Sequence, residues 1–110
     1  MSAHTHIFDL DGTLLHFQTQ EWLPGALEIL EAIHKHGDKI LFITARGPHD
    51  EGKAWSIRAT EKVLAQLTVP YQIVYNVPGP RILHDDLPGG FDLHPFNGPW
   101  KFEIKDGSKA

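Results

Sequence analysis

The chain of 110 residues contains no cysteine, no long apolar run and no block of basic residues. Without cysteine, disulfide bridges and thiolate metal sites are both excluded. No apolar stretch approaches the roughly 20 residues that a membrane-spanning helix needs. The N-terminal residues also lack the basic start and apolar body of a secretory signal. We therefore expect a cytoplasmic protein that does not enter a membrane.

The charge of the chain is close to balanced, with a small acidic excess. There are 10 Lys and Arg against 14 Asp and Glu, a formal net charge of −4. Proteins that bind nucleic acid carry clustered positive charge, so we expect no general nucleic-acid-binding surface. The 8 histidines lack the spacing of a helical metal site. His4 and His6, like His34 and His36, are two positions apart, whereas ligands on one helical face need three or four.

Length and apolar content predict one small domain over residues 1–110, with 106–110 as a frayed tail. Four continuous apolar runs are typical of strands covered on both faces. They lie at residues 6–10, 40–43, 73–75 and 82–83.

Helices are expected between these runs, from Pro24 to His36 and from about Ala54 to Leu67. Strands and helices then alternate, which predicts right-handed crossovers and a parallel sheet. The expected fold is α/β, a Rossmann-like three-layer α/β/α arrangement. A weakly alternating segment at 100–104 predicts an additional edge strand.

Residues 7–15, Ile-Phe-Asp-Leu-Asp-Gly-Thr-Leu-Leu, carry the strongest chemical signal. A strand that ends in Asp9 and Asp11 points both carboxylates in nearly the same direction. Such close negative charges are usually neutralised by a hard divalent cation that binds oxygen ligands. Gly12 allows backbone N–H groups to approach an anion. Together these features indicate phosphoryl chemistry.

This stretch has two other interpretations. Asp and Gly dominate turns, so the segment could be a simple turn. A calcium loop would need further oxygen ligands and a closing Glu. The residues that follow, Leu14 to Phe17, do not supply them, and the apolar lead-in and Thr13 favour a catalytic strand end.

Further candidates follow the other strands, because ligands of open parallel sheets bind beyond the C-terminal strand ends. The second strand is followed by Thr44, Ala45 and Arg46, and the fourth, expected over 81–84, by Asp85-Asp86. Each has another interpretation. Thr44 could cap a helix, the acidic pair could form a solvated turn, and Arg46 could be a surface charge. Their occurrence at successive strand ends favours a common site.

These segments resemble motifs of the haloacid dehalogenase (HAD) superfamily of phosphohydrolases. The first motif matches Asp9 to Thr13, the second Leu41 to Thr44, and the fourth Ile82 to Asp86, so the resemblance spans residues 6–86. It implies Mg²⁺-dependent hydrolysis of a phosphomonoester through an aspartyl-phosphate. The implied substrate is a small phosphorylated metabolite such as a sugar phosphate or a nucleotide.

The resemblance also implies roles for individual residues. Asp9 would be the nucleophile, and Asp11 would be the general acid and base. The implied Mg²⁺ ligands are the Asp9 carboxylate, the backbone carbonyl of Asp11, and either Asp85 or Asp86. The implied phosphate-binding residues are Gly12, Thr13, Thr44, Ala45 and Arg46.

The chain departs from the family pattern at its third motif. The family places a Lys or Arg before the fourth strand, but Val77 stands where the lysine would align. Arg81 begins the expected strand and is predicted to lie at its wrong end. Arg46 is expected to be the better placed cation.

The family's usual cap domain has no room either. Only ten residues separate Thr13 from Pro24, enough for a short flap. The site should therefore be open, or covered by a second subunit of a homo-oligomer or by the tail. The tail aromatics, Phe91, Phe96 and Trp100, are expected to be core residues rather than a lid.

Trp22, in the flap, could line a substrate pocket, whereas Trp55 is expected to pack under its helix. Two other functions remain open at this point. One is a HAD-like binding or regulatory module with little turnover, suggested by the missing lysine and cap. The other is a polynucleotide 3′-phosphatase, against which the acidic balance argues.

Overall fold

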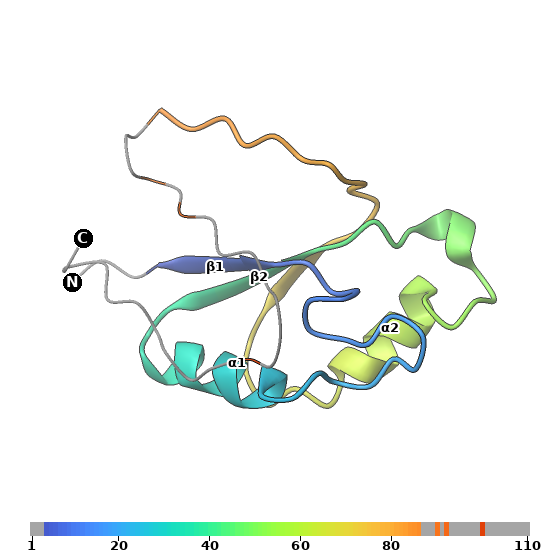
Figure 1. Ribbon diagram of the computed structural model, residues 1–110, viewed down its shortest axis with the longest axis horizontal. Coiled ribbons are helices and arrows are strands. Elements are labelled where there is room, and N and C mark those ends of the chain that lie inside the picture. The colour runs from blue at the N-terminus through green and yellow to red at the C-terminus, as the bar shows by residue number, and fades with distance from the viewer. Residues whose placement is uncertain (1–3, 87–89, 91, 93–99, 101–110) are drawn as a thin grey trace.

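The computed structural model describes residues 4–86 together with Gly90, Asp92 and Trp100. Its three strands form a parallel sheet in the order β1-β2-β3, with helices between them (Figure 1). The elements are β1 (Thr5–Phe8), α1 (Ala26–Lys35), β2 (Lys39–Ile43), the 3₁₀ turn η1 (Pro48–Asp50), α2 (Ile57–Leu64) and β3 (Gln72–Val74). The α/β class and the parallel sheet are thus confirmed.

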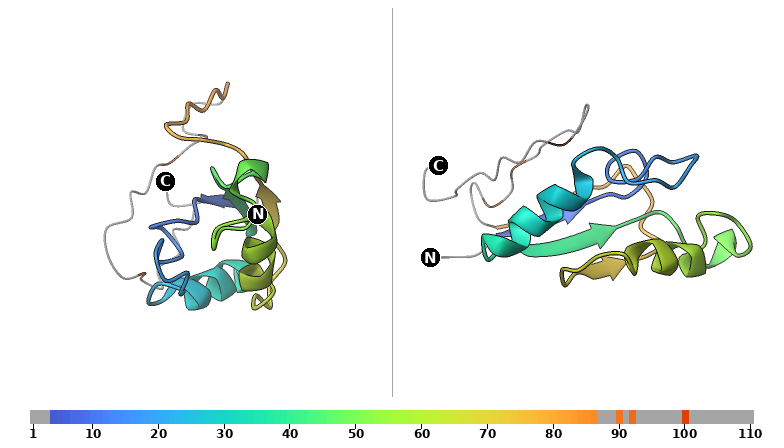
Figure 2. Two further views of the ribbon diagram at one scale, coloured as in Figure 1. Left: turned by 90° about the vertical axis from the view of Figure 1, so that its right-hand side faces the viewer. Right: turned by 90° about the horizontal axis from the view of Figure 1, so that it is seen from below.

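Both helices lie on the same face of the sheet (Figures 1 and 2). Successive right-handed crossovers that add strands in one direction place their helices on one side. The described residues show two layers, and the third layer remains a prediction. None of the helices in the described part of the chain is long and apolar enough to cross a bilayer.

The core lies between the sheet and α1. Ile29, Leu30 and Ile33 follow helical spacing and are buried, as are Phe8 and Phe42, which are register partners on neighbouring strands. Phe42 is completely buried because the helical layer covers that face of the central strand. These apolar positions explain why the predicted helix and strands form where they do.

Trp100 packs against the same core. Its ring meets Phe8 edge-on at 5.5 Å between centroids, and its indole Nε1–H donates to the carbonyl of Thr13 at 2.7 Å. A Cβ at Gly25 would lie 2.5 Å from the carbonyl oxygen of Trp100, and Gly25 has a φ of 81°. Trp100 is therefore partly buried against the core, whereas Phe91 and Phe96 lie outside the described residues.

Helix α2 begins later than its pattern predicts. The Ser56 side chain accepts a hydrogen bond from the Ala59 N–H at 3.1 Å and caps the helix. Serine is a preferred N-cap because it satisfies an otherwise unpaired amide of the first turn. Trp55 consequently precedes the helix instead of packing under it.

The expected fourth strand is wrong. Residues 81–85 form no strand, and Ile82 and Leu83 are 83% and 52% exposed. Figure 1 shows this orange segment leaving the end of β3 and running back apart from the sheet. An apolar run of only two residues, preceded by a proline without an N–H, offers too little burial and pairing to join a sheet. Trp100 is not in a strand, and the rest of the expected edge strand lies outside the described residues.

Candidate active site

The turn after β1 holds Asp9 and Asp11 on either side of a buried residue. Leu10 is completely buried, and its carbonyl accepts the N–H groups of residues 13–15 at 2.9–3.1 Å. Gly12 has a φ of 78°, a conformation that glycine adopts without strain. The tight turn therefore fixes the backbone that carries both carboxylates.

Asp9 is partly shielded from water. Its Oδ1 accepts the Leu10 N–H at 2.9 Å. Burial raises the pKa of Asp9 above its usual value, and the negative charge of Asp11 adds to this effect, while the Leu10 N–H and the charge of Arg81 oppose it. A carboxylate in such surroundings is less well solvated and is a better nucleophile than one in bulk water.

Arg81 lies beside Asp9. Its Nη2 is 3.8 Å from Asp9 Oδ1, and its Nε and Nη2 donate to the Val77 carbonyl at 3.1 and 2.7 Å. The expectation that Arg81 sits at the wrong end was therefore wrong. Because residues 81–85 do not form a strand, the guanidinium turns back to the site. The backbone of Val77, whose side chain replaces the expected lysine, positions it.

Thr44 joins the loops that follow β2 and β3. It is completely buried, and its Oγ1 accepts the Arg46 N–H at 3.2 Å. Its own N–H donates to the Val74 carbonyl at 3.1 Å, and its carbonyl accepts the Val77 N–H at 2.9 Å. Thr44 thus aligns two strand ends beside the Asp9–Asp11 turn.

Arg46 is 2% exposed and directs its guanidinium at Asp11. Its Nε donates to Asp11 Oδ2 at 3.0 Å, and its Nη2 donates to Asp11 Oδ1. Further bonds join Nη2 to Gln20 Oε1 at 2.7 Å and Nη1 to Thr60 Oγ1 at 2.6 Å. In this arrangement Arg46 ties together the turn after β1, the flap and α2. It contacts Asp11 in the way the sequence suggested for a phosphate.

Two of the expected phosphate-binding amides already have partners within the turn. The Gly12 N–H donates to the Leu15 carbonyl at 2.8 Å, and the Thr13 N–H donates to the Leu10 carbonyl at 3.1 Å. Ala45 is exposed in the loop after β2.

Asp85 and Asp86 do not join the carboxylates of the turn. Both are exposed on the segment that leaves the sheet, and the described residues contain no group of three or more Asp, Glu or His that could hold a metal. The donors at the site are the oxygens of Asp9 and Asp11. Mg²⁺ is often held by one or two carboxylates that water and a substrate phosphate complete. The donor set at this turn fits that mode and does not require the acidic pair.

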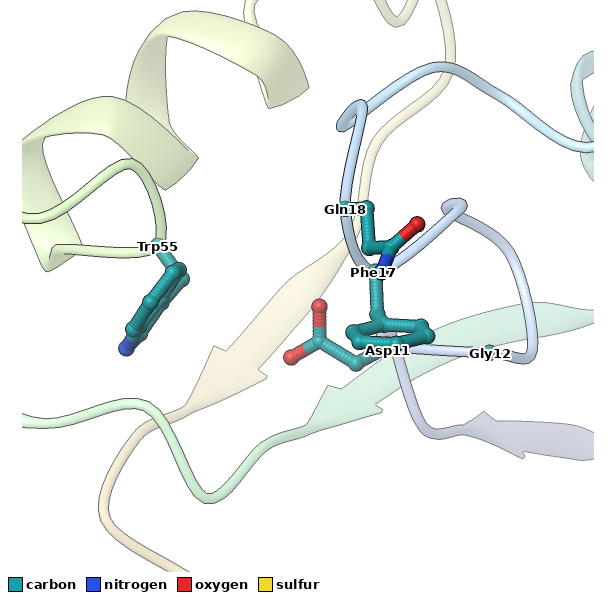
Figure 3. Close-up of a pocket in the computed structure, with 5 residues that line it drawn as sticks. All are labelled: Asp11, Gly12, Phe17, Gln18 and Trp55. Atoms are coloured by element: carbon teal, nitrogen blue, oxygen red, sulfur yellow. The ribbon is translucent and has the colours of Figure 1, made fainter.

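An open depression of about 550 Å³ lies in front of the turn (Figure 3). Its lining residues are Asp11, Gly12, Phe17, Gln18 and Trp55. Trp55 does not pack under its helix as expected, and Trp22 is not among the residues that line the depression. Trp22 packs against the core and donates to Gln66 Oε1 at 3.2 Å, whereas Trp55 borders the depression. Ser56, recognised as a helix cap, would have placed Trp55 outside the helix.

Comparison with protein-family models, with curated proteins and with solved structures finds no match to this chain. The resemblance to HAD phosphohydrolases therefore depends on the residues themselves. Asp9 to Thr13 and Thr44 carry it, since they follow neighbouring parallel strands. The fourth motif does not contribute in the form expected.

Proposed function

We propose that this chain is a small, capless phosphomonoester hydrolase of the HAD type that works through an aspartyl-phosphate. The observation that supports it is Asp9 at the C-terminal end of β1, with Arg81 3.8 Å away and Asp11 one residue beyond. A partly desolvated carboxylate is a suitable nucleophile, and a neighbouring guanidinium offsets its repulsion of a phosphate.

The reaction proceeds in two displacements. Asp9 attacks phosphorus through Oδ2, since Oδ1 already accepts the Leu10 N–H, and the bond from phosphorus to the leaving oxygen breaks. Asp11 gives that oxygen a proton. Water then attacks phosphorus, Asp11 takes up its proton, and phosphate leaves with Asp9 restored. Mg²⁺, held by the Asp9 carboxylate and the backbone carbonyl of Asp11, would supply charge neutralisation.

Asp11 must part from Arg46 before it can serve as the acid. Both of its oxygens accept hydrogen bonds from the guanidinium. Arg46 retains Gln20 and Thr60 as partners when Asp11 turns away. The same pair favours a second candidate, a phosphate-binding module with little turnover, in which Asp11 stays bound to Arg46.

Phosphate release from a panel of phosphomonoesters in the presence of Mg²⁺ separates the candidates. The hydrolase proposal requires release that Asp9→Asn abolishes. The binding module instead predicts calorimetric binding of inorganic phosphate without turnover. If wild type releases no more phosphate than Asp9→Asn on any compound, the chain is not a phosphatase.

A further inference from the structure

Two exposed aromatic side chains border the depression in front of Asp11. Phe17 is 60% exposed and Trp55 is 41% exposed. Figure 3 shows them on opposite sides of the space into which the Asp11 carboxylate projects, Phe17 from the flap and Trp55 from the loop before α2. Large aromatic surfaces left in water at a cleft are a feature of ligand-binding sites.

Trp55 is held in place although its ring is exposed. Its Nε1–H donates to Asp50 Oδ1 at 3.1 Å. Asp50 is buried, and its Oδ2 accepts the Gly47 N–H at 3.0 Å in the loop after β2. A buried carboxylate is costly to maintain. Its bond to an exposed indole fixes the ring at the border of the depression before any ligand arrives, which lowers the entropic cost of stacking.

The flap holds Phe17 in a similar way. His16 accepts the Gln18 and Thr19 N–H groups on Nδ1 at 3.3 Å, and its ring stacks on Phe17 at 5.9 Å between centroids. The Gln20 side chain donates to the Phe17 carbonyl at 2.9 Å while it accepts from Arg46. The ring that borders the depression is therefore connected to the residue that holds Asp11.

We propose that this pair of aromatic side chains binds a flat ring in the leaving group, so that the substrate is a nucleoside monophosphate rather than a simple sugar phosphate. The inference rests on the proposed hydrolase function. Aromatic faces stack on any nucleobase, because every base has a π-face. The space of about 550 Å³ is within the size range of small-ligand sites, and Asp11 projects into it where the leaving oxygen would need a proton.

Adenosine 5′-monophosphate and ribose 5-phosphate form a matched test, because both carry the phosphate on the same ribose carbon. We expect kcat/KM to be about tenfold higher for the nucleotide, within the range given by one base–aromatic stack. Trp55→Ala should bring the ratio of kcat/KM for the nucleotide to kcat/KM for ribose 5-phosphate close to one. Trp55→Phe should retain most of the preference for the nucleotide. Leu27→Ala, which shortens an exposed apolar side chain on α1, should leave the ratio unchanged.

The outcomes distinguish this inference from the hydrolase proposal. Hydrolysis of both compounds at equal kcat/KM overturns the inference and leaves the hydrolase intact. If neither compound is hydrolysed, calorimetry of the wild-type chain with each compound decides. Tighter binding of the nucleotide that Trp55→Ala abolishes supports the ring site, and equal affinities or no binding of either overturns it.

Discussion

The buried guanidinium of Arg46 holds both carboxylate oxygens of Asp11, a residue 35 positions earlier in the chain. It also bonds Gln20 in the flap and Thr60 in α2. A single side chain thus connects the turn after β1, the flap and a helix. Fold and candidate chemistry therefore depend on the same residue.

Arg46→Ala should destabilise the fold. The change leaves the Asp11 carboxylate and the Thr60 hydroxyl without the guanidinium, and we expect a loss of about 2 kcal/mol. This is below the cost of breaking a fully buried pair because Asp11 reaches solvent. Urea unfolding with an unchanged m-value would measure it. Lys35→Ala, which breaks an exposed pair with Glu31 on α1, is the control and should cause no measurable change.

Asp9→Asn should stop phosphate release and also stabilise the chain at neutral pH. The pKa of Asp9 is raised by burial, so the folded state keeps its proton where the unfolded state has lost it. The contribution of Asp9 to the free energy of unfolding therefore falls as pH rises from the unfolded pKa through the folded pKa. Asparagine stays neutral, and its Oδ1 can still accept the Leu10 N–H. Thermal unfolding over a pH series should show that the variant becomes more stable than wild type as the pH rises across that interval. A variant that is less stable than wild type at neutral pH would contradict this prediction.

Arg81→Ala should lower turnover with little effect on stability. The Arg81 side chain is partly exposed, and its contacts described above are the ion pair with Asp9 and the hydrogen bonds to a backbone carbonyl. We expect a loss of about a hundredfold in kcat, comparable to removal of one donor that stabilises transition-state charge. Steady-state phosphate release measures it. Arg58→Ala changes an exposed position on α2 and, as the control, should retain wild-type kcat. If Arg81→Ala also retains wild-type kcat, Arg81 has no role in catalysis.

Asp50→Ala should destabilise the loop that carries Trp55. The hydrogen bond from Gly47, with that from Trp55, keeps the pKa of Asp50 below its usual value. Such a group stabilises the fold above its unfolded pKa, and the contribution is lost as pH falls through the folded pKa. The stability difference between wild type and Asp50→Ala should therefore shrink in acid. Urea midpoints at neutral and acidic pH measure this, and Asp50→Asn, which keeps an acceptor for Trp55, should lie between the two.

The local apolar pattern of the sequence predicts the helices and strands that pack on the sheet. β2 covers the predicted run 40–43, and α1 lies within the predicted helix, because continuous apolar runs and helical spacing reflect burial on the sheet. The segment 82–83 has the same residue types, but two residues bury too little apolar surface to offset the conformational entropy that ordering a strand costs. Only the tertiary structure shows this.

The candidate site, too, could be predicted only in part. Asp9, Asp11 and Thr44 were predicted together because parallel strands end at one edge. The partners of Arg46 and Arg81 depend on the direction of long side chains, which strand order does not determine. Arg46 was expected to meet an anion and it does, but that anion is Asp11 of the same chain.

The bond from Trp100 to the Thr13 carbonyl spans 87 positions of sequence. During synthesis the turn that carries Asp9 and Asp11 is made early, yet the indole that packs against Phe8 beside it arrives only when residue 100 has left the ribosome. Contacts of such separation form late in folding, since a long loop must close before they are gained. The core beside the turn that carries Asp9 and Asp11 is therefore incomplete until residue 100 has been synthesised.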